Sequence, residues 1–142
     1  MNMETISATE VRKKWSETCD NAAWVRPSFI KRTRDVFMFA NSKDMIKLLS
    51  YFKFVVEVYK EKKGITLVLK DMDLAAHGND LEEACHKIAE DILEYAEEYY
   101  ENYHLYSNAP NRSDHLPYVI KALLLNDAEK IQGEIICQDG QN

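Results

Sequence analysis

The chain has 142 residues, 46% of them hydrophobic and 11% aromatic, which is enough for one ordinary domain or two very small ones. No stretch approaches the roughly eighteen uninterrupted apolar residues of a membrane span. Residues 1–9 hold no apolar run of the signal-peptide type, so we expect a cytoplasmic protein with no membrane partner. The cysteines have no C-x-x-C spacing and fit neither a disulfide framework nor a zinc finger, so we expect reduced thiols at Cys19, Cys85 and Cys137.

Charge is divided unevenly along the chain. The net charge of −6 argues against nucleic acid, because Lys and Arg that neutralise phosphates supply most of the affinity in such complexes. Residues 1–43, however, hold eight Lys/Arg against five Asp/Glu, net +3, whereas residues 44–142 are net −9. This division is typical of a basic binding head joined to an acidic body, although it also fits ordinary surface variation.

The first predicted helix begins at Ala8. Ser7 and Glu10 have the S-x-x-E spacing of a capping box, in which both side chains accept hydrogen bonds from free backbone N–H groups. Four apolar residues then recur at helical spacing: Val11, Trp15, Cys19 and Ala22. Three basic residues fall beside this apolar stripe and are expected to point outward: Arg12, Lys13 and Lys14.

A β-hairpin and a second helix follow Pro27. Two apolar runs, residues 28–32 and 36–40, predict two strands joined around Thr33-Arg34-Asp35, although the turn lacks Asn-Gly or Asp-Gly. Asn41 or Ser42 then caps a helix that runs to Leu49. With a short strand before the first helix, the predicted order is β-α-β-β-α.

This order, with S-A-T-E-V-R-K-K-W-S from Ser7 and P-S-F-I-K-R from Pro27, resembles the DNA-binding module of the prevent-host-death (Phd/YefM) antitoxins. In that family two copies pair, and the dimer binds operator DNA through an arginine on the first helix and another at the end of the following strand. The matching positions are Arg12 and Arg32. Three further side chains are expected to assist DNA binding: Lys13, Lys31 and Arg34, the last as a substitute for Arg32 because the turn is shorter than in the family.

The pattern changes to strict alternation beyond residues 51–53. Two strand faces are predicted, one from Phe54, Val56 and Val58 and the other from Ile65, Leu67 and Leu69. Gly64 closes the turn between them, and a short third strand ends at Gly78. Asn79 or Asp80 then caps a long helix to about Tyr103, with these positions facing the core: Leu81, Ala84 or Cys85, Ile88, Ile92, Tyr95 and Tyr99.

This second region resembles the HicB antitoxin fold, a three-stranded antiparallel meander followed by a helix. The resemblance covers about residues 52–103 and implies a protein-interaction or dimerisation role. It is carried by Gly64, Asp71, Leu74, Gly78, Asp80 and Glu82-Glu83-Ala84.

The last third is predicted to hold an irregular loop at Ser107–Ser113 and two helices. Pro117 lies near the start of the first of these helices, and Asn126 and Glu129 have a capping spacing for the second. Ile131, Ile135 and Ile136 are expected to lie in the second helix, and residues from Gln138 onward to fray. Phd-type antitoxins usually end in a polar segment that folds on the toxin, but this chain is too apolar after Asn41 to remain disordered.

Catalytic and metal chemistry is not expected. A two-metal nuclease needs converging carboxylates, but the acidic residues after the second strand are better explained as solvated turn and cap residues: Asp71, Asp73, Asp80, Glu82 and Glu83. The four histidines never take H-x-x-x-H spacing, and no nucleophile elbow, P-loop or dinucleotide motif is present. We therefore expect no enzyme, no metal and no cofactor.

The long helix carries a tyrosine stripe and an acidic face. Tyr95, Tyr99, Tyr100, Tyr103 and Tyr106 form the stripe, and the acidic face consists of Glu90, Asp91, Glu94, Glu97, Glu98 and Glu101. Together they could bind a basic ribonuclease toxin. The alternative is that the tyrosines line the edge of the core and the acids face water.

Together these patterns predict an α+β protein with a Phd/YefM-like DNA-binding and dimerisation module at 1–51 and a HicB-like domain with C-terminal helices at 52–142. The expected function is that of a type II antitoxin, which neutralises a cognate toxin and binds operator DNA as a homodimer to repress its own operon. Two alternatives are a stand-alone DNA-binding regulator without a toxin and a pure protein-interaction module.

Overall fold

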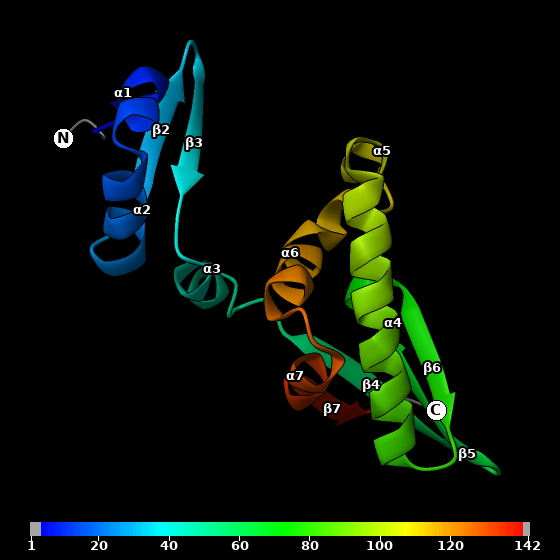
Figure 1. The fold of residues 1–142 in the computed structure, drawn as a ribbon. Helices are drawn as coiled ribbons and strands as arrows, with labels where there is room; N and C mark the ends of the chain where they lie inside the picture. Colours follow the sequence, from blue (N-terminus) through cyan, green and yellow to red (C-terminus); the bar gives the residue numbers. More distant parts are fainter. Residues whose placement is uncertain (1–3, 141–142) are drawn as a thin grey trace. The chain divides into compact units, whose positions relative to one another are not determined.

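The protein, described here by a computed structural model for residues 4–140, is a mixed α+β chain with two sheets and seven α-helices. The chain folds into two compact units, with unit 1 ending at Leu48 and unit 2 beginning at Leu49 (Figure 1). No helix among the described residues is long and apolar enough to cross a membrane. Each unit has its own sheet.

Unit 1 is a small three-stranded sheet with helices between its first two strands. Its elements are β1 (Ile6–Ser7), α1 (Ala8–Lys13), α2 (Trp15–Trp24), β2 (Ser28–Arg32), β3 (Asp35–Phe39) and α3 (Ser42–Leu48). The strand order is β1-β2-β3, with β1 parallel and β3 antiparallel to β2. The predicted β-α-β-β-α order is therefore present, with the first helix divided in two.

The local signals in unit 1 explain where its elements begin and end. The Ser7 hydroxyl accepts a hydrogen bond from the Glu10 N–H at 3.1 Å, which confirms the predicted helix start at Ala8. The single helix expected through Ala22 is wrong, because the backbone at Lys14 (φ −120°, ψ 42°) leaves the helical region and separates α1 from α2. The Asn41 side chain accepts from the Lys43 N–H at 3.0 Å and so caps α3.

The hairpin turn is tighter than predicted. Arg32 pairs with Asp35, so Asp35 belongs to β3 and only Thr33 and Arg34 form the turn. Thr33 has a φ of 56°, in the left-handed region that costs a β-branched residue roughly 1–2 kcal/mol. A positive φ in a hairpin turn is usually supplied by Gly, but here Thr33 adopts it.

Unit 2 consists of a four-stranded sheet with helices packed against it. Its elements are β4 (Phe54–Glu61), β5 (Gly64–Leu69), the 3-10 helix η1 (Lys70–Met72), β6 (Leu74–Gly78), α4 (Leu81–Glu101), α5 (Tyr103–Asn108), the 3-10 helix η2 (Ser113–His115), α6 (Leu116–Leu125), α7 (Ala128–Gly133) and β7 (Ile135–Asp139). The strand order is β6-β5-β4-β7. The antiparallel meander β4-β5-β6 was predicted, and the fourth strand was not.

Strand β7 corrects two predictions about the end of the chain. Ile135 and Ile136 were expected to continue a helix and Gln138 to fray, but they pair in parallel with β4, Ile135 opposite Phe54 and Gln138 opposite Glu57. The Gly140 N–H also donates to the Val58 carbonyl at 2.9 Å. A five-residue run carries little periodicity of its own, and its conformation is fixed by a partner strand far away in the sequence.

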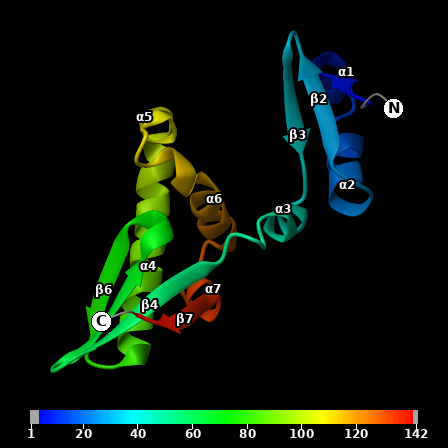
Figure 2. The same ribbon diagram turned by 180° about the vertical axis from the view of Figure 1, so that it is seen from behind.

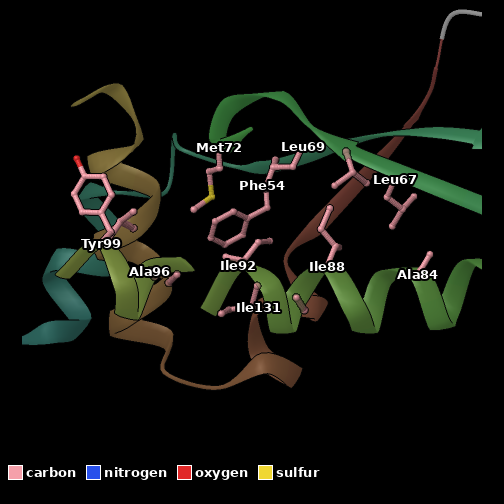
Figure 3. Close-up of a cluster of buried hydrophobic side chains, with 14 residues drawn as sticks. Phe54, Leu67, Leu69, Met72, Ala84, Ile88, Ile92, Ala96, Tyr99 and Ile131 are labelled. Carbon is pink, nitrogen blue, oxygen red and sulfur yellow. The ribbon is translucent and has the colours of Figure 1, made fainter. Parts of the chain in front are cut away.

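The core of unit 2 lies between the sheet and α4. Figure 1 shows α4 in front of the strands, and Figure 2, from behind, shows the strands in front of α4, so this helix covers one face of the sheet. Side chains from the strands, from α4 and from α7 meet there with no solvent exposure, among them Phe54, Leu67, Leu69, Ile88, Ile92, Tyr99 and Ile131 (Figure 3). Leu81, predicted to face this core, is instead 41% exposed.

Caps and turns hold the helices of unit 2 in place. Asp80 accepts from the Glu83 N–H at 2.8 Å, and Glu83 accepts from the Asn79 N–H at 2.9 Å, which makes a reciprocal cap for α4. The predicted loop at Ser107–Ser113 is wrong at both ends, because α5 continues to Asn108 and η2 begins at Ser113. Asp127 caps α7, whereas Asn126, the predicted cap, ends α6 in the left-handed conformation.

A buried lysine connects α6 to the start of β4 and to the residue after α7. The Lys121 ammonium donates to the Phe52 carbonyl at 3.0 Å, pairs with Glu134 at 3.2 Å and lies 5.2 Å from the centre of the Phe54 ring. These contacts compensate for the removal of the charge from water, so a residue type usually found on the surface is buried on an otherwise apolar helix.

Ile131 and Ile136, which were expected in one helix from the sequence, should differ in how much their replacement by Ala lowers the free energy of unfolding. Ile131→Ala should lower the free energy of unfolding by about 2–5 kcal/mol, because Ile131 is fully buried and its removal leaves a cavity. Ile136→Ala, at a side chain that is 42% exposed on β7, should cost less than about 1 kcal/mol. Urea denaturation followed by circular dichroism measures both values, and equal losses would contradict this placement of β7.

Candidate nucleic-acid interface

The basic residues predicted to bind DNA lie at one end of unit 1. Strand β1 leads directly into α1, and Ser7 lies opposite Lys31 in the parallel pair, so α1 starts beside the end of β2. Arg32 ends β2, and Arg34 lies in the turn that follows. Figure 1 shows α1 next to the tip of the hairpin. Five side chains that are dispersed in the sequence are therefore carried by neighbouring elements, namely Arg12, Lys13, Lys31, Arg32 and Arg34.

These five side chains are available for an anionic partner. All are exposed, whereas Val11, which precedes Arg12 on α1, is buried against the rest of unit 1. Within residues 4–140 none of the five makes an ion pair, although Glu10 and Asp35 are close in the sequence. Their charge is therefore not cancelled by a carboxylate of the same unit.

The backbone that carries these residues is suited to recognition of DNA. An arginine presents a planar fork that can bind a phosphate or the edge of a guanine with two hydrogen bonds. Arg12 is on a capped helix and Arg32 on a paired strand, so the backbone under each is fixed. Fixed backbones reduce the entropy lost when the side chains bind.

Unit 1 also exposes apolar surface. Trp24 is 85% exposed and Phe37 53% exposed, and six other large apolar side chains are exposed as well: Ile6, Trp15, Val25, Val36, Met38 and Leu48. A ring contact in this unit joins Trp15 and Phe39, whose ring centres are 5.5 Å apart, yet Trp15 remains largely in water. Exposure of this extent on so small a unit is typical of a surface that another chain covers.

In unit 2 the predicted tyrosine stripe is split between the core and the surface. Tyr95, Tyr99 and Tyr106 turn inward around Arg112, whose guanidinium carbon lies 4.1 Å from the centre of the Tyr106 ring. The buried Nη1 atom of Arg112 has no hydrogen-bond partner in residues 4–140, so the ring faces supply its favourable contacts. Tyr100 is exposed and Tyr103 partly so.

A buried histidine joins this aromatic cluster to Asp73, the residue after η1. The Tyr95 hydroxyl and His115 Nδ1 are 2.6 Å apart, and His115 Nε2 lies 3.4 Å from Asp73 Oδ2. Burial raises the pKa of the Tyr95 hydroxyl above its usual range. No spacing in the sequence indicated this cluster, because its members come from separate segments.

The acidic residues after β5 have separate structural roles. Asp80 and Glu83 cap α4, Glu83 also pairs with Lys87 at 3.2 Å, and Asp73 faces His115. In the part of the chain that the structure describes, no group of three or more His, Cys, Asp or Glu side chains could hold a metal ion.

The cysteines are free thiols. Burial raises the pKa of the Cys85 thiol to about 11, with Cys137 beside it as a smaller cause. At neutral pH Cys85 is therefore protonated and a poor nucleophile.

Two comparisons with known proteins both lead to antitoxins. The family model PHD_like, described as "Antitoxin of toxin-antitoxin, RelE / RelB, TA system", matches residues 1–137. The chain is also similar to a crystal structure from Syntrophomonas wolfei subsp. wolfei, described as an antitoxin part of a proposed toxin/antitoxin system. These two chains are 36% identical with a TM-score of 0.91, over 97% of this chain and 100% of that one. No curated protein gave a significant match.

Proposed function

Because the chain belongs to the PHD_like family of antitoxins of RelE/RelB toxin–antitoxin systems, we propose that it neutralises a cognate toxin and, as a homodimer, binds operator DNA to repress its own operon. Residues 1–51 would supply DNA binding and dimerisation, and residues 52–142 would face the toxin. The observation that carries the DNA-binding part is the set of five exposed, unpaired basic side chains at one end of unit 1.

Dimerisation is supported by the hydrophobic surface of unit 1. Val36, Phe37 and Met38 are consecutive in β3 and all exposed, so both faces of this strand present apolar side chains. Strand β3 is also an edge of its sheet, with one row of backbone groups free to pair. A second copy would cover this surface and would bring two basic ends to one DNA duplex.

We assign toxin binding to unit 2 because this unit is negatively charged and because it is folded without a partner. Residues 44–142 carry a net charge of −9, which attracts a basic protein and repels DNA. Unit 2 has a core of its own, so its surface is formed before a toxin arrives. Asp80 and Glu83 cap α4, Glu83 pairs with Lys87 and Asp73 faces His115, and we propose a binding role without catalysis, metal or cofactor.

Neutralisation of a toxin is expected to be visible in growing cells. Expression of the reading frame next to this one should arrest growth, and co-expression of the full chain should restore it, because a bound toxin cannot reach its substrate. The growth rate with and without the chain measures this. A neighbouring product that is harmless, or whose effect the chain does not relieve, would contradict the antitoxin role in this operon.

Operator binding is expected to depend on Arg12 and Arg32. Replacing either with Ala should cost about 1–3 kcal/mol per half-site if it reads a base, or weaken all sequences alike and reduce the salt dependence if it contacts phosphate. Fluorescence anisotropy with the upstream promoter fragment at two salt concentrations separates the two cases.

Arg26→Ala is the matched control for this experiment. Arg26 is an exposed arginine of the same unit, but it precedes β2, whereas Arg32 ends that strand. Its replacement removes the same charge and should change the affinity much less. Unchanged binding by a folded Arg12→Ala/Arg32→Ala double variant would rule out the assignment of these two residues.

The full chain is expected to be a dimer that Phe37→Asp dissociates. A charge placed on β3 would be buried without a partner in the dimer and solvated in the monomer. Light scattering at micromolar concentration should give twice the 16.5 kDa chain mass for the wild type and one chain mass for Phe37→Asp. Tyr51→Asp, at a ring that is 91% exposed outside β3, should remain dimeric, and a monomeric wild type would exclude this assembly.

A further inference from the structure

Two 3-10 helices of unit 2 border a pocket that the proposed function leaves unassigned. η1 and η2 are far apart in the sequence but lie next to each other, and His115 Nε2, at the end of η2, is 3.4 Å from Oδ2 of Asp73, the residue after η1. Residues of both 3-10 helices line a cavity of about 510 Å³, here called the η1–η2 pocket. Its lining includes Phe52, Asp71, Asp114, Leu116, Pro117 and Tyr118.

The lining of the η1–η2 pocket combines aromatic rings with carboxylates. The Phe52 and Tyr118 rings meet edge to face, with centres 5.5 Å apart and planes at 86°. Asp71 and Asp114 are exposed, and neither makes an ion pair within residues 4–140. Asp114 does not cap α6 either, because no side chain caps the start of that helix.

Within the described part of the chain, no lysine or arginine lines the pocket. Burial raises the pKa of the Tyr118 hydroxyl, and the negative charge of Asp71 raises it further. The pocket is therefore a negatively charged environment with aromatic walls. Exposed carboxylates are ordinarily just solvated, but these two lie at an aromatic cavity large enough to admit a side chain.

The same group of rings already binds a cation of its own chain. Lys121 Nζ lies 5.2 Å from the centre of the Phe54 ring, and the Phe54 ring centre is 6.5 Å from that of Tyr118. Ring faces attract ammonium and guanidinium groups, most strongly where water is partly excluded. The aromatic group thus stabilises one cation within the core, and the η1–η2 pocket offers similar chemistry to a cation from outside.

We propose that the η1–η2 pocket receives an arginine or lysine side chain of the toxin, an inference that rests on the proposed antitoxin function. The aliphatic part of the side chain would pack on Leu116 and Pro117, and its charged group would lie between the carboxylates and the rings. The partner is a basic protein, because unit 2 carries most of the negative charge of the chain and so favours the approach of a positive surface.

The test compares two double variants of the full chain. Asp71→Asn/Asp114→Asn removes both carboxylates of the pocket. Glu129→Gln/Asp139→Asn removes the same number of charges from exposed positions on α7 and β7 that make no ion pair within residues 4–140, and serves as the matched control. Isothermal titration calorimetry measures the affinity of each for the purified product of the adjacent reading frame, after circular dichroism and a thermal melt have shown that both are folded.

The pocket variant should bind the toxin at least about tenfold more weakly than the wild type, and the control should stay within about threefold. Equal weakening of both variants would assign the effect to total charge and overturn the proposal. Unchanged affinity of the pocket variant would overturn it as well, while leaving the antitoxin function intact.

A second probe separates the pocket from the proposed function. N-acetyl-arginine amide should bind the wild type with a Kd in the millimolar range and shift the NMR signals of Phe52 and Tyr118, and the pocket variant should show no such shift. If the neighbouring product does not bind the wild type, the antitoxin function in this operon fails, whereas the arginine probe still reports on the pocket. Identical shifts in wild type and pocket variant would show that the pocket does not select cations.

Discussion

The packing of α4 against the four-stranded sheet is the interaction on which unit 2 depends. One stripe of this helix, including Ile88, Ile92 and Ala96, is removed completely from solvent, and the strands supply the opposite wall with Phe54, Leu67 and Leu69. Burial of this apolar area is the main favourable term in the folding of such a unit. Helices α6 and α7 complete the same core, so the segments that border the η1–η2 pocket are positioned by it.

Unit 1, in contrast to unit 2, has a small core and much exposed apolar surface. Among its described residues only two apolar side chains are buried, Val11 and Ala22, while large side chains such as Trp24 and Phe37 remain in water. A unit of this size buries a small share of its surface and is marginal alone, so association adds stability that its own core lacks. In the proposed dimer, the partner that covers the apolar surface would also supply a second set of arginines.

Unit 2 is folded without a partner, and this affects how an antitoxin of this kind would bind its toxin. A segment that folds on its toxin loses conformational entropy at the moment of binding, which reduces the affinity per area of interface. Here the acids, rings and helices of unit 2 are held by caps, by the Lys121 contacts and by the core before any partner binds. Binding energy from a preformed surface is not spent on folding, and pockets such as the one between η1 and η2 exist in the free protein.

The sequence by itself determined the elements that carry strong local signals. The Ser7 cap, the hairpin that contains Lys31 and Arg32, the alternating strands around Gly64 and the Asp80 cap all follow from nearby residues, and so does the exposure of the basic side chains. The tertiary structure alone decided features made by distant segments. Strand β7 exists because β4 offers it an edge, and Lys121 is buried because the Phe52 carbonyl and Glu134 receive its charge. Asp71 and Asp114 line one pocket only because η1 and η2 lie next to each other. Periodicity and capping are local properties of the chain, whereas these contacts depend on which surfaces the folded core brings together.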